Sequence, residues 1–254
     1  MRGEAHVSVR RADGANRLVR LRQAGSAKVR LPRVEAGAPL EAIVLNTAGG
    51  LTGGDRLKTT VEVGAGAALM ASSQAAERAY RSPGGEAEVE TSLSVAEGGR
   101  LDWIPQETIL FEGSRLRRRL TADVASGSVL LAAEAIVLGR TAMGETLHDI
   151  GFTDVWRIRR GGRLVFADGS RLIGDAVAAM AGGATGNGAR CFATVVLVDP
   201  SADAALEAAR AALVIDGVEA GTSVWNGVLV ARIVAADSQP LRAAMAALIE
   251  CLRG

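Results

Sequence analysis

The chain has 254 residues and a formal net charge of +1, and its basic and acidic residues are interspersed. This balance excludes the large field of one sign that attracts nucleic acid or an anionic membrane. A hydrophobic content of 48% excludes a disordered chain and predicts a globular protein with a buried core. The longest apolar run, Val129 to Leu138, is interrupted by Glu134 and falls short of the ~20 residues that a membrane-spanning helix needs.

The cysteines and histidines are few. Cys191 and Cys251 lie far apart, which predicts reduced thiols and a cytoplasmic protein. The first residues include no apolar signal segment, in line with that expectation. Two histidines, His6 and His148, are too few for a His-rich metal store or a closed His/Cys zinc site.

A short pattern recurs in the first two thirds of the chain: an aliphatic residue, two residues, Gly, two residues, Leu. The starts of the five copies are spaced by 29, 32, 29 and 34 residues. Polar and apolar residues alternate over residues 61–69, 87–95 and 116–124, as in β-strands that flank a turn. A period near 30 residues is typical of stacked units. The copies are Val34–Leu40, Val63–Leu69, Val95–Leu101, Val124–Leu130 and Ile158–Leu164.

These patterns predict a mainly β protein, with stacked β-hairpins in a β-helix-like layered structure and two helices toward the C-terminus. We expect a stacked β region over residues 1–181, a Gly-rich loop over 182–189, and C-terminal strands and helices over 190–254, all packed in one domain. After the loop, a buried strand is expected over 190–199 and a helix from Ser201 to about Ile215.

The last 30 residues predict a hairpin and a helix. Asn226-Gly227 is typical of a hairpin turn, and a strand is expected from Val228 to Ala235. Ser238 and Pro240 are suited to open the final helix. The inward face of that helix is expected to carry Leu241, Met245, Leu248 and Leu252.

Two glycine pairs stand at positions 49–50 and 53–54. The surrounding segment, Gly49 to Arg56, has some features of a phosphate-binding loop but lacks the Gly-Lys-Ser/Thr that positions phosphate and magnesium. We expect Gly49, Gly50, Gly53 and Gly54 to let the backbone turn sharply or approach another segment closely. Likewise, no Gly-x-Ser-x-Gly nucleophile elbow occurs.

Several carboxylates stand at predicted strand ends and connections. An Asp beside Gly usually stabilises a turn, and a carboxylate in an apolar run must be paired, hydrogen-bonded or protonated. The alternative interpretation is that these groups line a wet interior or a contact surface. They are Asp55, Glu77, Glu107, Glu134 and Glu145.

In their order along the chain, five segments resemble the urease accessory protein D family, also called H. The resemblance covers about residues 17–250, and the combination of segments is more specific than any one of them. Two departures are visible. Asn46-Thr47-Ala48-Gly49-Gly50 stands where many members have Asn-Pro-Gly-Gly-Gly, and many members continue past the position of Gly254 with a short tail. The segments are 41–57, 74–82, 103–111, 138–145 and 154–168.

This resemblance implies a β-helix-like fold and a non-enzymatic chaperone of urease metallocentre assembly. It implies an adaptor that works with accessory proteins F and G to insert nickel into apo-urease, with no tightly bound cofactor and nickel only in transit. Oxygen ligands would hold nickel loosely, as a passage requires. We expect transient nickel contacts at Asp55 and Glu145. Further passage or interface positions would be Asn46, Gly49, Gly50, Gly53, Gly54, Gln74, Glu77, Tyr80, Glu107, Glu134 and Arg140.

Two other functions stay open at this point. One is a β-solenoid enzyme acting on a polysaccharide, with Asp102 and Glu107 as acid and base. Such an enzyme usually needs an aromatic-lined groove, and the chain has only three Trp, one Tyr and four Phe. The other is a scaffold in the same complex that does not conduct nickel, which the sequence does not distinguish from a conduit.

Overall fold

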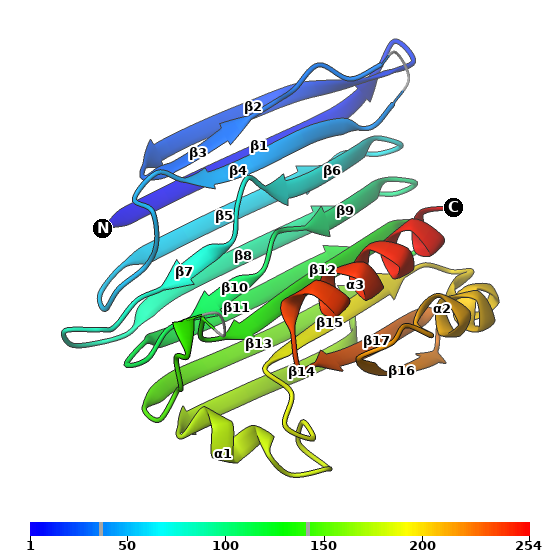
Figure 1. Cartoon of the computed structure of the whole chain (residues 1–254). Helices are drawn as coiled ribbons and strands as arrows, with labels where there is room; N and C mark the ends of the chain where they lie inside the picture. The colour runs from blue at the N-terminus through cyan, green and yellow to red at the C-terminus, as the bar shows by residue number, and fades with distance from the viewer. Residues whose placement is uncertain (36–37, 141–142) are drawn as a thin grey trace.

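The protein is built from two β-sheets that face each other. The computed structural model describes residues 1–35, 38–140 and 143–254. Sheet A and sheet B stack as two layers, and three helices lie outside them (Figure 1). The predicted mainly β, β-helix-like architecture is confirmed. In the described part of the chain, no helix is both long and apolar enough to cross a membrane.

Sheet A has seven strands within the described residues, in the order β14-β13-β11-β8-β5-β1-β2. Its central strands run parallel, and antiparallel hairpins close both edges. The strands are β1 (Arg2–Ala12), β2 (Ala15–Gly25), β5 (Arg56–Val63), β8 (Ala87–Val95), β11 (Arg115–Val124), β13 (Ile150–Arg160) and β14 (Arg163–Gly174).

Sheet B follows the order β16-β17-β15-β12-β9-β6-β4-β3, with two short strands, β7 and β10, beside this path. Strands β4, β6, β9 and β12 are parallel, and β15, β17 and β16 extend the sheet antiparallel. The strands are β3 (Ala27–Arg30), β4 (Leu40–Asn46), β6 (Ala68–Ser73), β7 (Glu77–Ala79), β9 (Arg100–Ile104), β10 (Thr108–Leu110), β12 (Val129–Leu138), β15 (Cys191–Val198), β16 (Val218–Trp225) and β17 (Val228–Ala235).

The sequence repeat corresponds to stacked turns between the two sheets. In the second, third and fourth copies the Gly turn connects a strand of sheet A to a strand of sheet B, so the flanking strands are not hairpin partners. Equivalent positions stack in register: Val63 pairs with Val95 and Val95 with Val124. On the other side of the turn, Leu69 pairs with Leu101 and Leu101 with Leu130. Parallel stacking lets each unit cover the apolar side chains of the next.

The first and last copies differ from the middle three. The fifth copy is an antiparallel hairpin, in which β13 pairs with β14, and it lies out of step because Ile158 is aligned with Ala122. The first copy includes residues 36–37, which lie outside the described residues, although Leu40 does align with Leu69. Hairpins therefore close the stack, whereas turns between the sheets build its middle.

Three apolar clusters fill the structure. The largest lies between the sheets and includes the stacked Val and Leu positions of the repeat. A second, smaller cluster between the sheets surrounds Leu116, Ile136 and Phe152. The third lies on the outer side of sheet B, beneath the C-terminal helices. Sheet B is therefore buried on both faces along β12, β15 and β17, which explains the nearly uninterrupted apolar sequence of β12.

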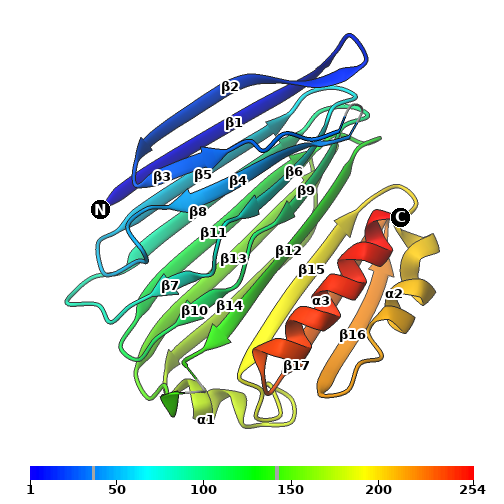
Figure 2. The ribbon, with the colours of Figure 1, turned by 45° about the horizontal axis from the view of Figure 1, so that its top comes forward.

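The C-terminal elements agree with the predictions. Helix α3 (Ser238–Arg253) lies along the outer side of sheet B and buries Leu241, Met245, Leu248 and Leu252 (Figure 2). Its N-cap is Asp237, whose side chain accepts a hydrogen bond from the Gln239 N–H, so the helix begins at the predicted Ser238.

The other helices are shorter. The predicted helix after Ser201 divides into a 3₁₀ turn (Ala202–Ala205) and α2 (Leu206–Ala212), and Ser201 provides no side-chain cap. A further short helix, α1 (Ala176–Met180), precedes the Gly-rich loop and was not predicted. At the predicted hairpin turn, Asn226 and Gly227 both have positive φ, as a type I′ turn requires.

The glycines at positions 49–54 serve backbone geometry, as predicted. Gly49 and Gly54 have φ of 78° and 83°. A Cβ on Gly50 would lie 2.7 Å from the Arg78 carbonyl oxygen and 2.3 Å from the Tyr80 ring. A Cβ on Gly53 would lie 2.2 Å from the Gly84 carbonyl oxygen. These glycines let the loop before β5 pack against β7 and the segment that follows it.

Replacing Gly53 with Val should lower the free energy of unfolding by about 2–4 kcal/mol, because the new side chain collides with backbone atoms that cannot move independently. Urea denaturation followed by circular dichroism measures the change. Gly221→Ala in β16 is the control: a Cβ there meets nothing within 4 Å, so the change should stay within about 0.5 kcal/mol. Equal stability of both variants would contradict a packing role for Gly53.

Candidate functional site

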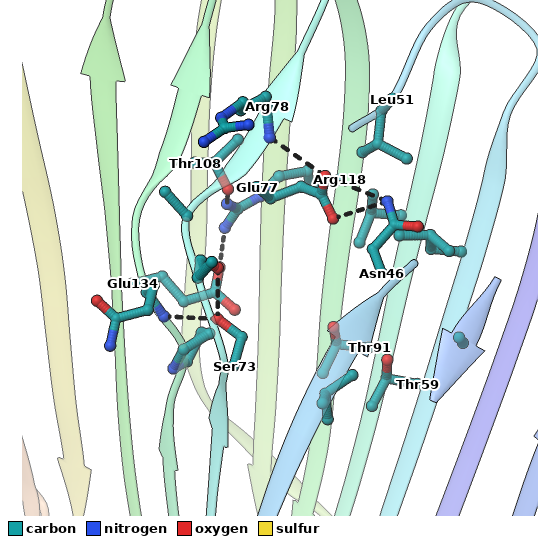
Figure 3. Close-up of a pocket in the computed structure, with 18 of the residues that line it drawn as sticks. Asn46, Leu51, Thr59, Ser73, Glu77, Arg78, Thr91, Thr108, Arg118 and Glu134 are labelled. Carbon is teal, nitrogen blue, oxygen red and sulfur yellow. Dashed lines mark hydrogen bonds and ion pairs between the residues drawn. The ribbon is translucent and has the colours of Figure 1, made fainter. Parts of the chain in front are cut away.

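A cavity of about 290 Å³ lies between the sheets, beneath a break in sheet B (Figure 3). Strand β6 ends at Ser73 before β7 begins, and β9 ends at Ile104 before β10 begins. Pro105 has no N–H to continue the ladder, which favours the break. Within the break, hydrogen bonds join the two neighbouring chain segments: the Gln106 N–H donates to Ser73 Oγ at 2.9 Å, and the Glu77 N–H donates to the Glu107 carbonyl at 2.9 Å.

The floor of the cavity is a polar layer between two apolar layers. On β11, the buried Arg118 lies between Leu116 of one apolar cluster and Leu120 of the other. Asp154 lies at the same level of the stack on β13, and Glu134 lies at that level on β12 of the opposite sheet. Arg118 and Asp154 are aligned on adjacent strands, so stacking brings their side chains together.

Hydrogen bonds and ion pairs link the polar layer. The Arg118 guanidinium forms an ion pair with Glu134 and donates to Asp154 Oδ2 at 3.1 Å and to Thr108 Oγ1 at 2.9 Å. Trp103 Nε1–H donates to Glu134 Oε1 at 2.7 Å. One guanidinium thus serves two carboxyl groups.

The two carboxylate oxygens of Asp154 differ in their hydrogen bonds. Oδ2 accepts from Trp156 Nε1–H at 3.2 Å as well as from Arg118. Oδ1 is buried and has no hydrogen-bond partner within the described residues. A buried acceptor of this kind beside a cavity is suited to a hydrogen-bond donor or a hydrated cation.

Nearer the break, Glu77 and Asn46 form a second polar group. Asn46 Nδ2 donates to both carboxylate oxygens of Glu77, at 3.2 and 3.1 Å, and the Arg78 N–H donates to Oε1 at 3.1 Å. Asn46 Oδ1 in turn accepts from the Ala48 N–H at 3.1 Å, which fixes the turn after β4. Burial raises the pKa of Glu77 above its ordinary value and outweighs the opposing hydrogen bonds from Asn46 and Arg78.

The structure brings five of the predicted site residues to this cavity. They come from the end of β4 and the turn after it, from the break after β6 and the start of β7, and from β12, and Thr59, Thr91 and Thr108 line the same cavity. The five are Asn46, Gly49, Gln74, Glu77 and Glu134.

Asp55 does not line the cavity. It is buried at the start of β5, where Oδ2 accepts from the Thr52 N–H at 2.9 Å. Oδ1 lies 2.5 Å from the amino group of Met1. The first contact stabilises the turn before β5, and the second attaches the amino terminus to it.

Glu145 likewise has local partners outside the cavity. It accepts from Arg140 Nε at 2.9 Å and from the N–H groups of Arg140 and Glu112. Burial acts to raise the pKa of Glu145, but these hydrogen bonds together bring it below its ordinary value. Arg140 also lies over the Phe111 ring, 4.6 Å from its centroid.

The remaining predicted positions have other settings. Tyr80 packs edge-on against Phe111 and covers Gly50. Glu107 lies in a groove beside α3 and pairs with Arg242 at 3.0 Å. Asp102, the other carboxylate of the enzyme alternative, is buried between Arg100 and Arg253, at 3.0 Å from each.

The sequence analysis missed Arg118 and Asp154. The inward positions of β11 are otherwise aliphatic, so a charged residue among them was a usable signal. Asp154 between Phe152 and Trp156 is the same signal on β13. Within residues 1–35, 38–140 and 143–254, no group of three or more His, Cys, Asp or Glu is arranged to hold a metal ion.

Replacing Arg118 with Met should destabilise the protein by about 3–5 kcal/mol, because the buried Glu134 and the largely buried Asp154 lose their shared cation. The added change Glu134→Leu should restore part of that loss. The free energy of unfolding in urea tests both expectations. Arg119→Met is the control, since the neighbouring Arg119 is exposed on the outer face of the same strand. No difference between Arg118→Met and Arg119→Met would contradict the role of the polar layer.

Replacing Glu77 with Gln should make stability depend less on pH. A raised pKa means that the folded protein binds the proton more tightly than the unfolded chain does. Wild-type stability therefore rises, relative to Glu77→Gln, as the pH falls through the folded-state pKa, and the ionised carboxylate costs stability at neutral pH. The advantage of Glu77→Gln should thus be larger at pH 7–8 than near pH 4–5, which urea titrations at several pH values measure. A constant difference across that range would contradict the burial of Glu77.

Known proteins identify the family. The family model described as UreD urease accessory protein matches residues 1–254. A urease accessory protein UreD of Cereibacter sphaeroides (strain ATCC 17025 / ATH 2.4.3) is 49% identical over 252 residues, which cover 99% of this chain and 91% of the relative. Those of Methylobacterium sp. (strain 4-46) and Rhizobium leguminosarum bv. trifolii (strain WSM2304) are 46% and 45% identical, over 96% and 99% of this chain and 88% and 91% of the relatives. The chain belongs to the UreD urease accessory protein family, and its role lies in urease maturation.

Proposed function

We propose that the chain is a non-enzymatic adaptor that works with accessory proteins F and G to deliver nickel to apo-urease. The cavity between the sheets would form part of the nickel passage. One observation carries this proposal: carboxylates stand both beside the break in sheet B, at Glu77, and on the cavity floor, at Glu134 and Asp154. A cytoplasmic location is part of the proposal, in keeping with two cysteines that are both free thiols.

The chemistry of the lining suits an ion in transit. Nickel binds imidazole and thiolate more firmly than carboxylate, amide and hydroxyl oxygens, and the polar groups around this cavity are mostly of the latter kind. Weak ligands let an ion enter and leave. A chain of such ligands therefore favours passage over storage.

The carboxylates of the cavity differ in how much neighbouring positive charge compensates their own charge. Glu134 shares a buried ion pair with Arg118, whose positive charge opposes a second cation beside it. Glu77 is held by the neutral amide of Asn46 and by a backbone N–H. Asp154 also pairs with Arg118, but only through Oδ2, and its Oδ1 has no hydrogen-bond partner among the described residues and lines the same cavity. We therefore place the first nickel contact at Glu77 and the next at Asp154, with structural roles for Asp55 and Glu145.

The second candidate is a scaffold in the same complex, with nickel travelling elsewhere. The ion pair of Arg118 favours it, because a cation at the floor of the cavity would have to pass a fixed positive charge. Both candidates require the chain to assemble with its partners. Only the conduit requires the lining of the cavity for nickel transfer.

Glu77→Gln should lower the nickel content of urease several-fold while assembly continues, because it removes a charge and keeps the side-chain size. Thr59→Phe should do the same by filling the cavity. The measurement is nickel per urease after co-expression with F and G, together with the yield of the complex on a tagged chain.

Glu90→Gln is the matched control, because Glu90 is exposed on β8 of sheet A and does not line the cavity. Loss of both nickel and assembly would assign Glu77 a structural role. Unchanged nickel content in both cavity variants, each shown to be folded, would leave the scaffold as the function.

A further inference from the structure

Strand β2 is an open edge of sheet A. It spans 11 residues and pairs with β1 on one side, and no described strand lies on its other side (Figures 1 and 2). The N–H and C=O groups along that side are therefore available to a further strand. A short strand or inward-pointing charges often protect such an edge. Strand β2 is long, and its inward positions are uncharged.

The inner side of β2 is aliphatic and only partly covered. Leu18 and Leu21 are aligned with buried valines of β1, so they point toward the core side of the sheet. The register shifts at Val19, and this bulge puts both leucines on the same side although they are three residues apart. The two leucines are nevertheless 42% and 38% exposed, and Val19 is 57% exposed. All six residues over 17–22 are exposed, so the opposite sheet does not cover this part of the strand.

The other open edges of the described chain differ from β2. The inward side chains of β14 are buried or half-buried. On β16 the exposed residues before Trp225 are Glu, Ala, Gly and Ser, with no large aliphatic side chain among them. Strand β3 has only four residues, and its Val29 N–H already donates to Gln23 Oε1 at 2.7 Å. An unpaired backbone beside exposed large aliphatic side chains on the inner side is therefore a property of β2.

The outer side of the same segment is basic. Arg17, Arg20 and Arg22 point away from the core, since they are aligned with outward residues of β1. Arg22 lies 3.3 Å from Glu4, whereas neither Arg17 nor Arg20 makes an ion pair with any residue that the structure describes. A carboxylate directly opposite these arginines on an added strand would be stabilised, and a basic residue there would be repelled.

A second copy of this chain does not provide a suitable strand. Two β2 edges would bring their rows of arginines together, and like charges opposite each other destabilise a sheet. The other long open edges, β14 and β16, carry one acidic residue each, Asp168 and Glu219, and show no alternation of acidic and aliphatic residues. The strand that fits this edge therefore belongs to another protein.

We propose that residues 17–22 of β2 form a docking edge for an extended segment of another protein in which acidic and aliphatic residues alternate. The segment adds a strand to sheet A through backbone hydrogen bonds. Its aliphatic side chains cover Leu18 and Leu21, and its carboxylates face Arg17 and Arg20. No residue of β2 lines the cavity, so this docking edge does not depend on nickel passing between the sheets.

The test uses the full chain and three fluorescent heptapeptides. In the first, Glu alternates with Val and Leu; in the second, Lys replaces each Glu; in the third, Pro replaces the central residue of the acidic peptide. Fluorescence anisotropy at about 50 mM NaCl measures each affinity, because low salt preserves the attraction between exposed charges. Hydrogen exchange followed by mass spectrometry then locates the bound peptide on the chain.

The double variant Arg17→Glu/Arg20→Glu reverses the charge of the docking edge. Its control is Arg163→Glu/Arg171→Glu, which makes the same charge change at two exposed arginines of β14, the opposite edge of sheet A. Wild type and control should bind the acidic peptide at least about tenfold more tightly than the basic or the Pro-containing peptide. The Arg17/Arg20 variant should instead prefer the basic peptide, and the acidic peptide should slow exchange in β2 of the wild type but not in β14.

Four results would overturn the proposal. Equal affinity for the acidic and Pro-containing peptides would mean that charge attraction acts without an added strand. The others are no binding of the acidic peptide, an unreversed preference in an Arg17/Arg20 variant whose circular dichroism matches that of the wild type, and slowed exchange outside β2. The exchange measurement uses the wild type, so it decides the question even where a variant does not fold.

Discussion

Parallel, in-register stacking of strands from two facing sheets is the constraint on which the rest of this structure depends. A single strand–turn–strand unit cannot cover its own aliphatic face, so each unit is stable only against its neighbours and the opposite sheet. The aligned Val63, Val95 and Val124 and the aligned Leu69, Leu101 and Leu130 show this directly. Hairpins at both ends of sheet A then stop the stack from growing further.

The same stacking explains why polar groups concentrate at one level. Because the strands are in register, a charged residue on one strand lies beside the residue at the same level of the next strand. Arg118 lies beside Asp154 in this way. Glu134 faces them from sheet B, and apolar layers above and below keep water from the sides. The break after Ser73 and Ile104 opens this level toward the outside. A packed core and a polar cavity thus arise from one architecture.

The outer faces of sheets A and B differ. On sheet B, α3 buries the aliphatic surface of β12, β15 and β17 and thereby completes the fold. Among the described residues no helix lies over the outer face of sheet A (Figure 1), and the exposed positions of its strands carry many charged residues.

The sequence by itself determined the β class, the period of the stack, the final helix and the hairpin at Asn226, because these depend on local alternation and turn chemistry. It also indicated that Glu134, inside an apolar run, needed a partner. Only the tertiary structure decided that the middle turns join different sheets, and that Arg118 is that partner. Asp55 and Glu145 stood in the most characteristic motifs, yet Asp55 is bound by the Thr52 N–H and the Met1 amino group, Glu145 by Arg140, and neither lines the cavity. Pairing across sheets depends on register between segments about 30 residues apart, and one sequence specifies neither that register nor the surface charge it creates.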